Sequence, residues 1–181
     1  MRRYRLTRTI LAIAVLTFLG RYAHAQEFSA SFSGFNEIGG LGAGETGAIL
    51  SNGKGKLDLD LDKDAGTLTY TLTYSDLVDV TQAHIHFGKV HVAGGIIAFL
   101  CTNLGNGPAR TPACPSTGGT VSGTLTAASV VGPTGQNVNP GDFNALEDAL
   151  DSNTAYGNIH TMKFPAGEIR GQIRHKKADE D

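Results

Sequence analysis

The sequence predicts an all-β protein, an antiparallel β-sandwich or barrel with one short crossover helix. Three observations lead to this fold class. Apolar and polar residues alternate with a period of two along much of the chain, 24 of the 181 residues are glycine, and one segment has helical spacing. Short strands that are separated by glycine-rich turns, with few helices, are typical of sandwiches and barrels.

The clearest strands form a hairpin. In "KLDLDLD" (56–62) leucines alternate with aspartates, and in "TLTYTLTY" (67–74) leucines and tyrosines alternate with threonines. Side chains of a strand point alternately to its two faces, so each run has one apolar and one polar face. The "KDAG" between them has the composition of a turn. Further strands are expected in "FSASF", "AHIHFG", "GGIIAFLC", "GTVSGTLT", "AYGNIHTM" and "GEIRGQIRH".

The expected helix lies in "DFNALEDAL". Phe143, Leu146 and Leu150 are spaced to share one face of a helix, and Asp142 is a suitable N-cap. This short helix is predicted to cross over between the strands that flank it in the sequence.

The N-terminus has the three parts of a secretory signal peptide, which are basic residues, an apolar run and the small-residue exit "AHA". The apolar run that begins at Ile10 has 11 residues, whereas a bilayer span needs roughly 20. We expect cleavage after Ala25 and a secreted or periplasmic location. The predicted organisation is a signal peptide at 1–25, one β domain at 26–175 and a charged, disordered tail at 176–181.

The net charge of the chain limits the kinds of molecule that it is expected to bind. Five of the 15 basic residues lie in the signal segment, which leaves 10 basic against 17 acidic residues, a net charge of about −7. An acidic chain without a basic stripe argues against nucleic acid. No membrane span is expected after signal cleavage, and the expected partner is an unknown extracellular or periplasmic ligand.

Cys101 and Cys114 are the two cysteines of the chain. In an oxidising compartment we expect them to form a disulfide. Closing this short loop would contribute roughly 3 kcal/mol in the chain-entropy model. The segment between them contains glycine and proline without apolar periodicity, which predicts a surface loop.

Three histidines are candidate metal ligands. His84 and His86 are two residues apart and share one face of a strand, while Ile85 points to the other face. His160 lies in another predicted strand, and pairing of the two strands would bring three imidazoles together, with His91 as a possible fourth. Three imidazoles are enough to hold copper or zinc.

The preferred interpretation from these residues alone is a hydrogen-bonded cluster without metal. Imidazoles on neighbouring strands can bond to carbonyls, threonine hydroxyls or Glu168. Glu168 and Arg170, in "GEIRGQI", share a face and are expected to form ion pairs. No serine has a nucleophile-elbow context and both cysteines are expected to be oxidised, so no catalytic residue and no enzymatic activity are predicted.

Taken together, "FSASFSGFNEIGG", "AHIHFG", "GTVSGTLT" and "YGNIHTMKFPAGEIRGQI" resemble the CHRD domain, which is named for the extracellular protein chordin and also occurs in secreted bacterial proteins. The resemblance covers nearly the whole mature chain, and His84, His86 and His160 match motif positions. It implies an immunoglobulin-like or Greek-key antiparallel β-sandwich or barrel, and a binding or structural module without established activity. Chordin's cysteine-rich modules are absent, so growth-factor binding is not carried over.

"HIHFG" also resembles the copper-binding strand of Cu/Zn superoxide dismutase, another Greek-key sandwich. The segment after His86 lacks the histidines and aspartate of a zinc loop. The resemblance therefore implies an alternative function, a histidine-based copper- or zinc-binding protein, without dismutase activity.

Overall fold

The computed structural model describes residues 25–38 and 47–176. This part of the chain forms one antiparallel sheet of nine strands in the order β5-β4-β7-β8-β1-β2-β3-β6, with β9 paired to β1. The elements are β1 (Gln26–Ser33), η1 (Gly34–Asn36), β2 (Lys54–Asp62), β3 (Thr67–Ser75), β4 (Val80–Phe87), β5 (Ile96–Thr102), β6 (Gly119–Leu125), η2 (Ala127–Ser129), η3 (Thr134–Gln136), α1 (Phe143–Asp151), β7 (Ala155–Thr161), β8 (Ile169–Gln172) and β9 (Arg174–His175).

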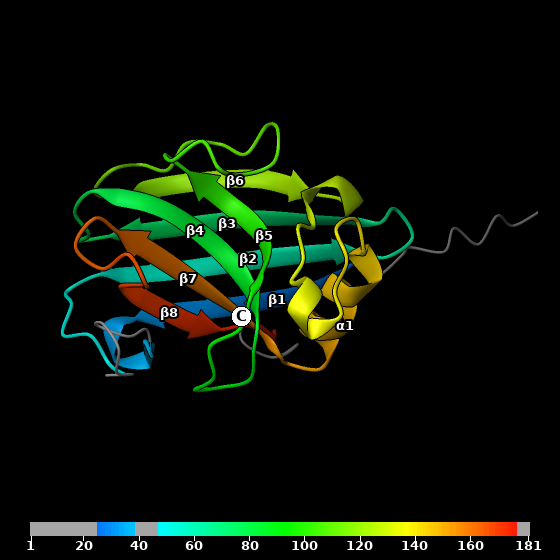
Figure 1. The fold of residues 1–181 in the computed structure, drawn as a ribbon, viewed down its shortest axis with the longest axis horizontal. Helices are drawn as coiled ribbons and strands as arrows, with labels where there is room; N and C mark the ends of the chain where they lie inside the picture. Colours follow the sequence, from blue (N-terminus) through cyan, green and yellow to red (C-terminus); the bar gives the residue numbers. More distant parts are fainter. Residues whose placement is uncertain (1–24, 39–46, 177–181) are drawn as a thin grey trace, which may run out of the picture.

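The sheet curls until its two edge strands, β5 and β6, approach each other (Figure 1). The hydroxyl of Tyr70, on β3, donates to the carbonyl of Leu100, on β5, at 2.6 Å and joins opposite walls. The result is a nearly closed barrel. The predicted all-β class with one short helix is confirmed, and of the two predicted architectures the barrel describes the sheet.

Alternate residues of the strands fill the barrel. The predicted hairpin pairs Leu57 with Leu72 and Leu61 with Leu68, and these four side chains are at most 1% exposed. The aspartates and threonines between them point outward, as the alternation predicts. Burying four leucines contributes roughly 1.5–3 kcal/mol for each side chain.

Gly157 of β7 leaves room for the ring of Phe32 in the core. A Cβ on Gly157 would lie 2.2 Å from the Cζ atom of Phe32, so any larger residue would collide with this ring. Phe32 is 3% exposed. The inner face of β7 is thus tightly packed, and its other face is left for polar side chains.

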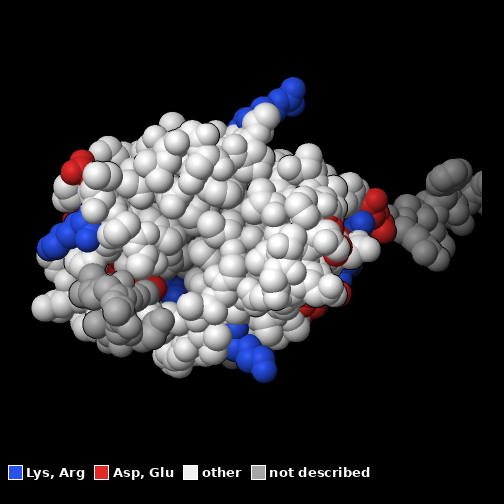
Figure 2. All heavy atoms as spheres, in the orientation of Figure 1, with Lys and Arg blue, Asp and Glu red and all other residues white. Residues whose placement is uncertain are grey.

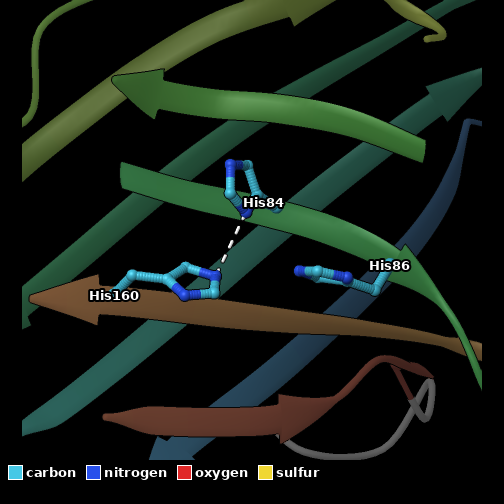
Figure 3. Close-up of side chains that lie close together, drawn as sticks. All are labelled: His84, His86 and His160. Carbon is cyan, nitrogen blue, oxygen red and sulfur yellow. Dashed lines mark hydrogen bonds between the residues drawn. The ribbon is translucent and has the colours of Figure 1, made fainter. Parts of the chain in front are cut away.

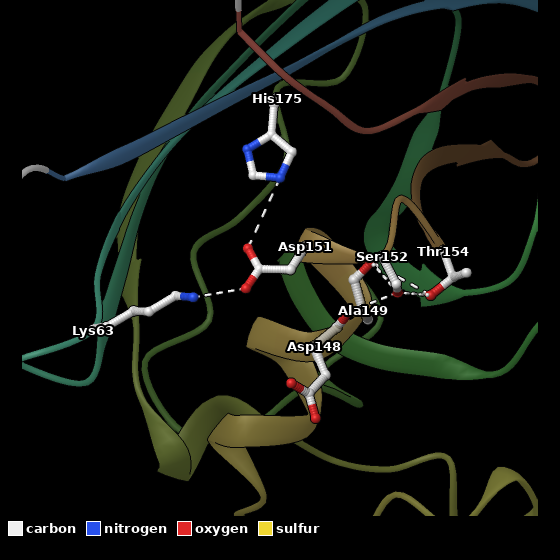
Figure 4. Close-up of polar contacts among 7 residues, drawn as sticks. All are labelled: Lys63, Asp148, Ala149, Asp151, Ser152, Thr154 and His175. Carbon is white, nitrogen blue, oxygen red and sulfur yellow. Dashed lines mark hydrogen bonds and ion pairs between the residues drawn. The ribbon is translucent and has the colours of Figure 1, made fainter.

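Helix α1 begins and packs as predicted. The side chain of Asp142 accepts the backbone N–H of Ala145 at 3.2 Å and caps the helix. At the other end, Asp151 contacts Lys63 at 2.6 Å and His175 at 3.9 Å (Figure 4). The helix therefore lies against the β2–β3 turn and β9, and its buried residues are Phe143, Leu146, Ala149 and Leu150.

Both predicted end segments lie largely outside the described residues, so the signal peptide and the disordered tail stay predictions. Lys176, the first residue of the predicted tail, donates its backbone N–H to the carbonyl of Glu27 at 2.9 Å. Among the described residues, no helix has the length and apolarity needed to cross a membrane.

Candidate metal site

Strand β4 lies between β5 and β7 and is buried on both faces. Its inner residues, Ala83 and Ile85, are fully buried in the barrel core. Its other face carries His84 and His86, as the alternation predicts. Pairing with β7 places His86 opposite Tyr156 and His84 opposite Asn158, and His160 follows two residues further along β7.

The three predicted histidines meet on the outer side of these two strands (Figure 3). The ring centroids of His84 and His160 are 4.9 Å apart, and those of His84 and His86 are 5.3 Å apart. Each ring offers one nitrogen, and the three nitrogens lie within 4.8 Å of one another. His91, the fourth candidate, is exposed and does not join this group.

Aromatic side chains help to bury the cluster, whose members are 0% (His84), 8% (His86) and 6% (His160) exposed. The ring of Phe99 meets His84 edge-on, with centroids 4.4 Å apart. The ring of Tyr156 stacks on His86 at 4.8 Å with an interplanar angle of 5°. The imidazoles are therefore held in fixed positions, and two of them retain a small contact with solvent.

Hydrogen bonds define the protonation of each ring. The Nδ1 atoms of His86 and His160 lie 3.0 Å from the carbonyl oxygens of Gly94 and Pro165. A carbonyl only accepts, so both Nδ1 atoms carry the proton and both Nε2 atoms are bare. The Nδ1 of His84 is 3.1 Å from the Nε2 of His160 and donates to it. The proton of His84 is thus on Nδ1 as well.

Two ring nitrogens are left over. The Nε2 atoms of His84 and His86 are buried, and neither has a hydrogen-bond partner within the described part of the chain. Buried polar atoms nearly always have a partner, because leaving one unpaired costs about 1–3 kcal/mol. A lone pair of this kind is the form in which histidine binds a metal ion. Carbonyl oxygens that hold Nδ1–H, as here, are typical partners of metal-binding imidazoles.

Burial keeps the three imidazoles neutral. It lowers the pKa of His84 to about 2, with a further contribution from the neighbouring His160 and His86. It also lowers the pKa of His86 to about 3 and that of His160 to about 4. Metal binding requires deprotonated ring nitrogens, and here the bare lone pairs exist at any physiological pH.

Glu168, predicted to form an ion pair, has two hydroxyl partners instead. Its carboxylate accepts the hydroxyl of Ser51 at 2.6 Å and that of Thr161 at 2.7 Å. It forms no ion pair with a described residue, and it is not a member of the histidine group. Its position, 8% exposed and bonded to two other segments, is that of a structural carboxylate.

Arg170 donates hydrogen bonds to backbone carbonyls, and the buried carboxylate of Glu37 interacts with its charge. Its Nη2 donates to the carbonyls of Lys89 (3.1 Å) and Val92 (2.9 Å), which belong to the loop between β4 and β5. Its guanidinium carbon lies 3.3 Å from the ring centroid of Tyr156. Arg170 therefore holds this loop over the sheet and brings a positive charge to the same tyrosine that covers His86.

Cys101 and Cys114 are joined by a disulfide, with Cα atoms 5.1 Å apart. Cys101 lies on β5 opposite Ala83 of β4, so the bond ties the following loop to the edge of the sheet next to the histidine strand.

Tyr156 belongs to the site although the sequence analysis did not single it out. Alternation along "AYGNIHTM" places it on the same face as Asn158 and His160, and this signal was available. The carbonyls of Gly94 and Pro165 come from irregular loops. Nothing in the sequence pattern marks those two positions.

Comparison with protein families shows that the CHRD domain model matches residues 28–173. The chain therefore belongs to the CHRD domain family, as its motifs indicated. Comparison with curated proteins finds no match.

Proposed function

We propose that this protein is an extracytoplasmic CHRD-domain module that binds one transition-metal ion, copper or zinc, through His84, His86 and His160. The observation that carries the proposal is the meeting of three buried imidazoles whose nitrogens lie within 4.8 Å of one another, together with the unpaired Nε2 of His86. The basic, apolar and "AHA" parts of the N-terminus and the disulfide support export.

One pair of nitrogens in the cluster has nearly the spacing that an ion needs. Two nitrogens bound to one tetrahedral ion at about 2.0 Å are roughly 3.3 Å apart, and the Nδ1 of His84 lies 3.1 Å from the Nε2 of His160. Moving the His84 proton from Nδ1 to Nε2 frees Nδ1 without changing the charge of the ring. The ion then takes the place of the proton between these two rings, and the Nε2 of His86 supplies the third ligand.

The other candidate function is a binding module whose histidines serve only the structure. The hydrogen bond between His84 and His160 and the two bonds to carbonyls favour it. It leaves the buried Nε2 of His86, next to the other two rings, without a role, which is why we prefer the metal-binding function.

Metal titration of the signal-processed protein, with chelators as competitors, distinguishes the two functions. We expect one equivalent of copper or zinc to bind with submicromolar affinity. His84→Ala and His160→Ala should each weaken binding about 100-fold or more, because each removes one of three ligands. His91→Ala is the matched control and should bind as the unaltered protein does. Unchanged affinity in the first two variants, together with reduced thermal stability, would show that the histidines are structural.

A further inference from the structure

We infer, on the basis of the proposed function, that this site selects the monovalent ion Cu(I) over the divalent ions Zn(II) and Cu(II). The inference rests on the charge of the groups around the three imidazoles. The neutral ligands, their burial and the enclosed position of the cluster favour an ion of low charge.

The ligands themselves are neutral. Among the described residues, the group that can hold an ion consists of three histidines, without a carboxylate or a thiolate. The carboxylate of Glu168, in the "GEIRGQI" motif, already accepts two hydroxyls. In Figure 2, the middle of the face that presents β4, β5 and β7 shows almost no charged side chains. The three ligands therefore do not neutralise any of the charge of a bound divalent ion.

Burial penalises that charge. The desolvation cost of an ion grows with the square of its charge, so a divalent ion loses roughly four times as much hydration energy as a monovalent ion of similar size. The three rings are between 0% and 8% exposed, and two of their neighbours are the aromatic side chains Phe99 and Tyr156. Anionic ligands would compensate a divalent ion for this loss, and this cluster supplies none.

Arg170 adds a positive charge, which the buried carboxylate of Glu37 offsets in part through its electrostatic interaction with the guanidinium. Its guanidinium lies 3.3 Å from the ring centroid of Tyr156, and the same ring stacks on His86 at 4.8 Å. A single aromatic ring, that of Tyr156, therefore lies between the guanidinium of Arg170 and the proposed ligand His86. Repulsion between Arg170 and the bound ion is twice as large for a divalent ion as for a monovalent one.

The number of available ligands also favours Cu(I) over Zn(II). Zn(II) sites with three protein ligands keep a fourth position for water or substrate. Here His84 is fully buried, and the aromatic rings on His84 and His86 leave only slight exposure at His86 and His160. Three neutral nitrogens in such an enclosed place suit Cu(I), a closed-shell ion that is stable with three ligands.

Anaerobic competition with Cu(I) and Zn(II) chelators tests the inference, because both ions have a filled d shell and differ in charge. We expect Cu(I) to bind at least about 1,000-fold more tightly than Zn(II), and more tightly than Cu(II) measured in air. Equal or tighter binding of Zn(II) or Cu(II) would overturn the preference for Cu(I) and leave the proposed metal-binding function intact. Binding of none of the three ions would overturn both.

A pair of variants isolates the contribution of charge. Arg170→Gln removes the cation and should shift the Zn(II)-to-Cu(I) affinity ratio about tenfold toward Zn(II). Arg170→Lys keeps the charge and loses the planar group that contacts Tyr156, so its ratio should stay close to that of the unaltered protein. A purely structural role of Arg170 predicts equal changes in both affinities, and an unaltered ratio in Arg170→Gln would contradict the electrostatic argument.

Discussion

Two buried polar clusters lie on opposite faces of β7, and they differ in whether their polar atoms have hydrogen-bond partners. Thr161 and its neighbour His160 are both buried, yet they belong to different clusters. On one side, both oxygens of Glu168 receive a hydroxyl, from Ser51 and from Thr161. On the other side, the histidine cluster keeps two bare nitrogens. Both clusters are buried. They differ in that every oxygen of Glu168 has a hydrogen-bond partner, whereas two nitrogens of the histidine cluster have none.

This difference indicates what each cluster is for. A carboxylate with every oxygen paired holds segments together, because its bonds offset the cost of burying it. Imidazoles with bare nitrogens lower the stability of the metal-free protein and raise its affinity for whatever supplies the missing bond. Under the proposed function, the Glu168 cluster serves the stability of the fold and the histidine cluster serves binding.

The largest expected effect is a loss of stability of the metal-free protein in acid. The folded-state pKa values of His84, His86 and His160 are about 2, about 3 and about 4, below the ordinary value of 6.5. Between pH 6.5 and pH 4 the unfolded chain therefore binds more protons than the folded one, and stability falls as the pH falls. Each histidine contributes up to about 1.4 kcal/mol per pH unit.

Urea unfolding in the presence of a chelator measures this loss. We expect the free energy of unfolding to fall by about 3 kcal/mol or more between pH 7 and pH 5, and to change little between pH 7 and pH 8. His84→Leu removes one of the three groups and should reduce the slope. Equal stability at pH 7 and pH 5 would contradict the burial of neutral imidazoles.

The next largest effect separates the two clusters. Glu168→Ala leaves the buried hydroxyl of Thr161 and the partly buried hydroxyl of Ser51 without their acceptor. It should lower the free energy of unfolding by about 2–3 kcal/mol, with unaltered metal affinity. His84→Leu should abolish metal binding and change stability by about 1 kcal/mol or less, because leucine fills most of the same space. Urea unfolding and metal titration of both variants provide the comparison. If Glu168→Ala weakens metal binding as much as His84→Leu does, the two clusters are not independent.

The smallest effect concerns the orientation of His86. The hydroxyl of Tyr156 accepts the N–H of Gly94 at 3.1 Å, and the carbonyl of Gly94 accepts Nδ1–H of His86. Tyr156→Phe keeps the stacked ring and removes this support, so metal affinity should fall by about tenfold. Titration of this variant beside the unaltered protein checks the effect. An unchanged affinity would show that Gly94 holds His86 without help from the tyrosine.

Local patterns were sufficient to predict much of the fold. The alternating leucines of β2 and β3 predict both strands and their inner faces, and Asp142 predicts the start of the helix. Closure of the sheet into a barrel was not determined by these patterns, because it depends on the approach of β5 and β6, which are distant in the order of the sheet. The sequence therefore left the sandwich and the barrel as alternatives.

The ligands of the candidate site could be predicted from the sequence, whereas the groups that surround them could not. Alternation places His84 and His86 on one face, and the pairing of β4 with β7 brings His160 beside them. The hydrogen bonds to Gly94 and Pro165 come from loop backbone, which has no side-chain signal. The ion pairs expected for Glu168 and Arg170 were inferred from charge alone. Glu168 accepts hydroxyls instead, and Arg170 donates to carbonyls while the carboxylate of Glu37 interacts with its charge.

X-ray absorption spectroscopy at the copper edge, on protein loaded with one equivalent of Cu(I), tests the central claim most directly. The account predicts three nitrogen neighbours at about 2.0 Å with the scattering pattern of imidazole rings, and loss of this pattern in His160→Ala. A copper environment of sulfur or of exchangeable oxygen, or a pattern that persists in His160→Ala, would contradict it.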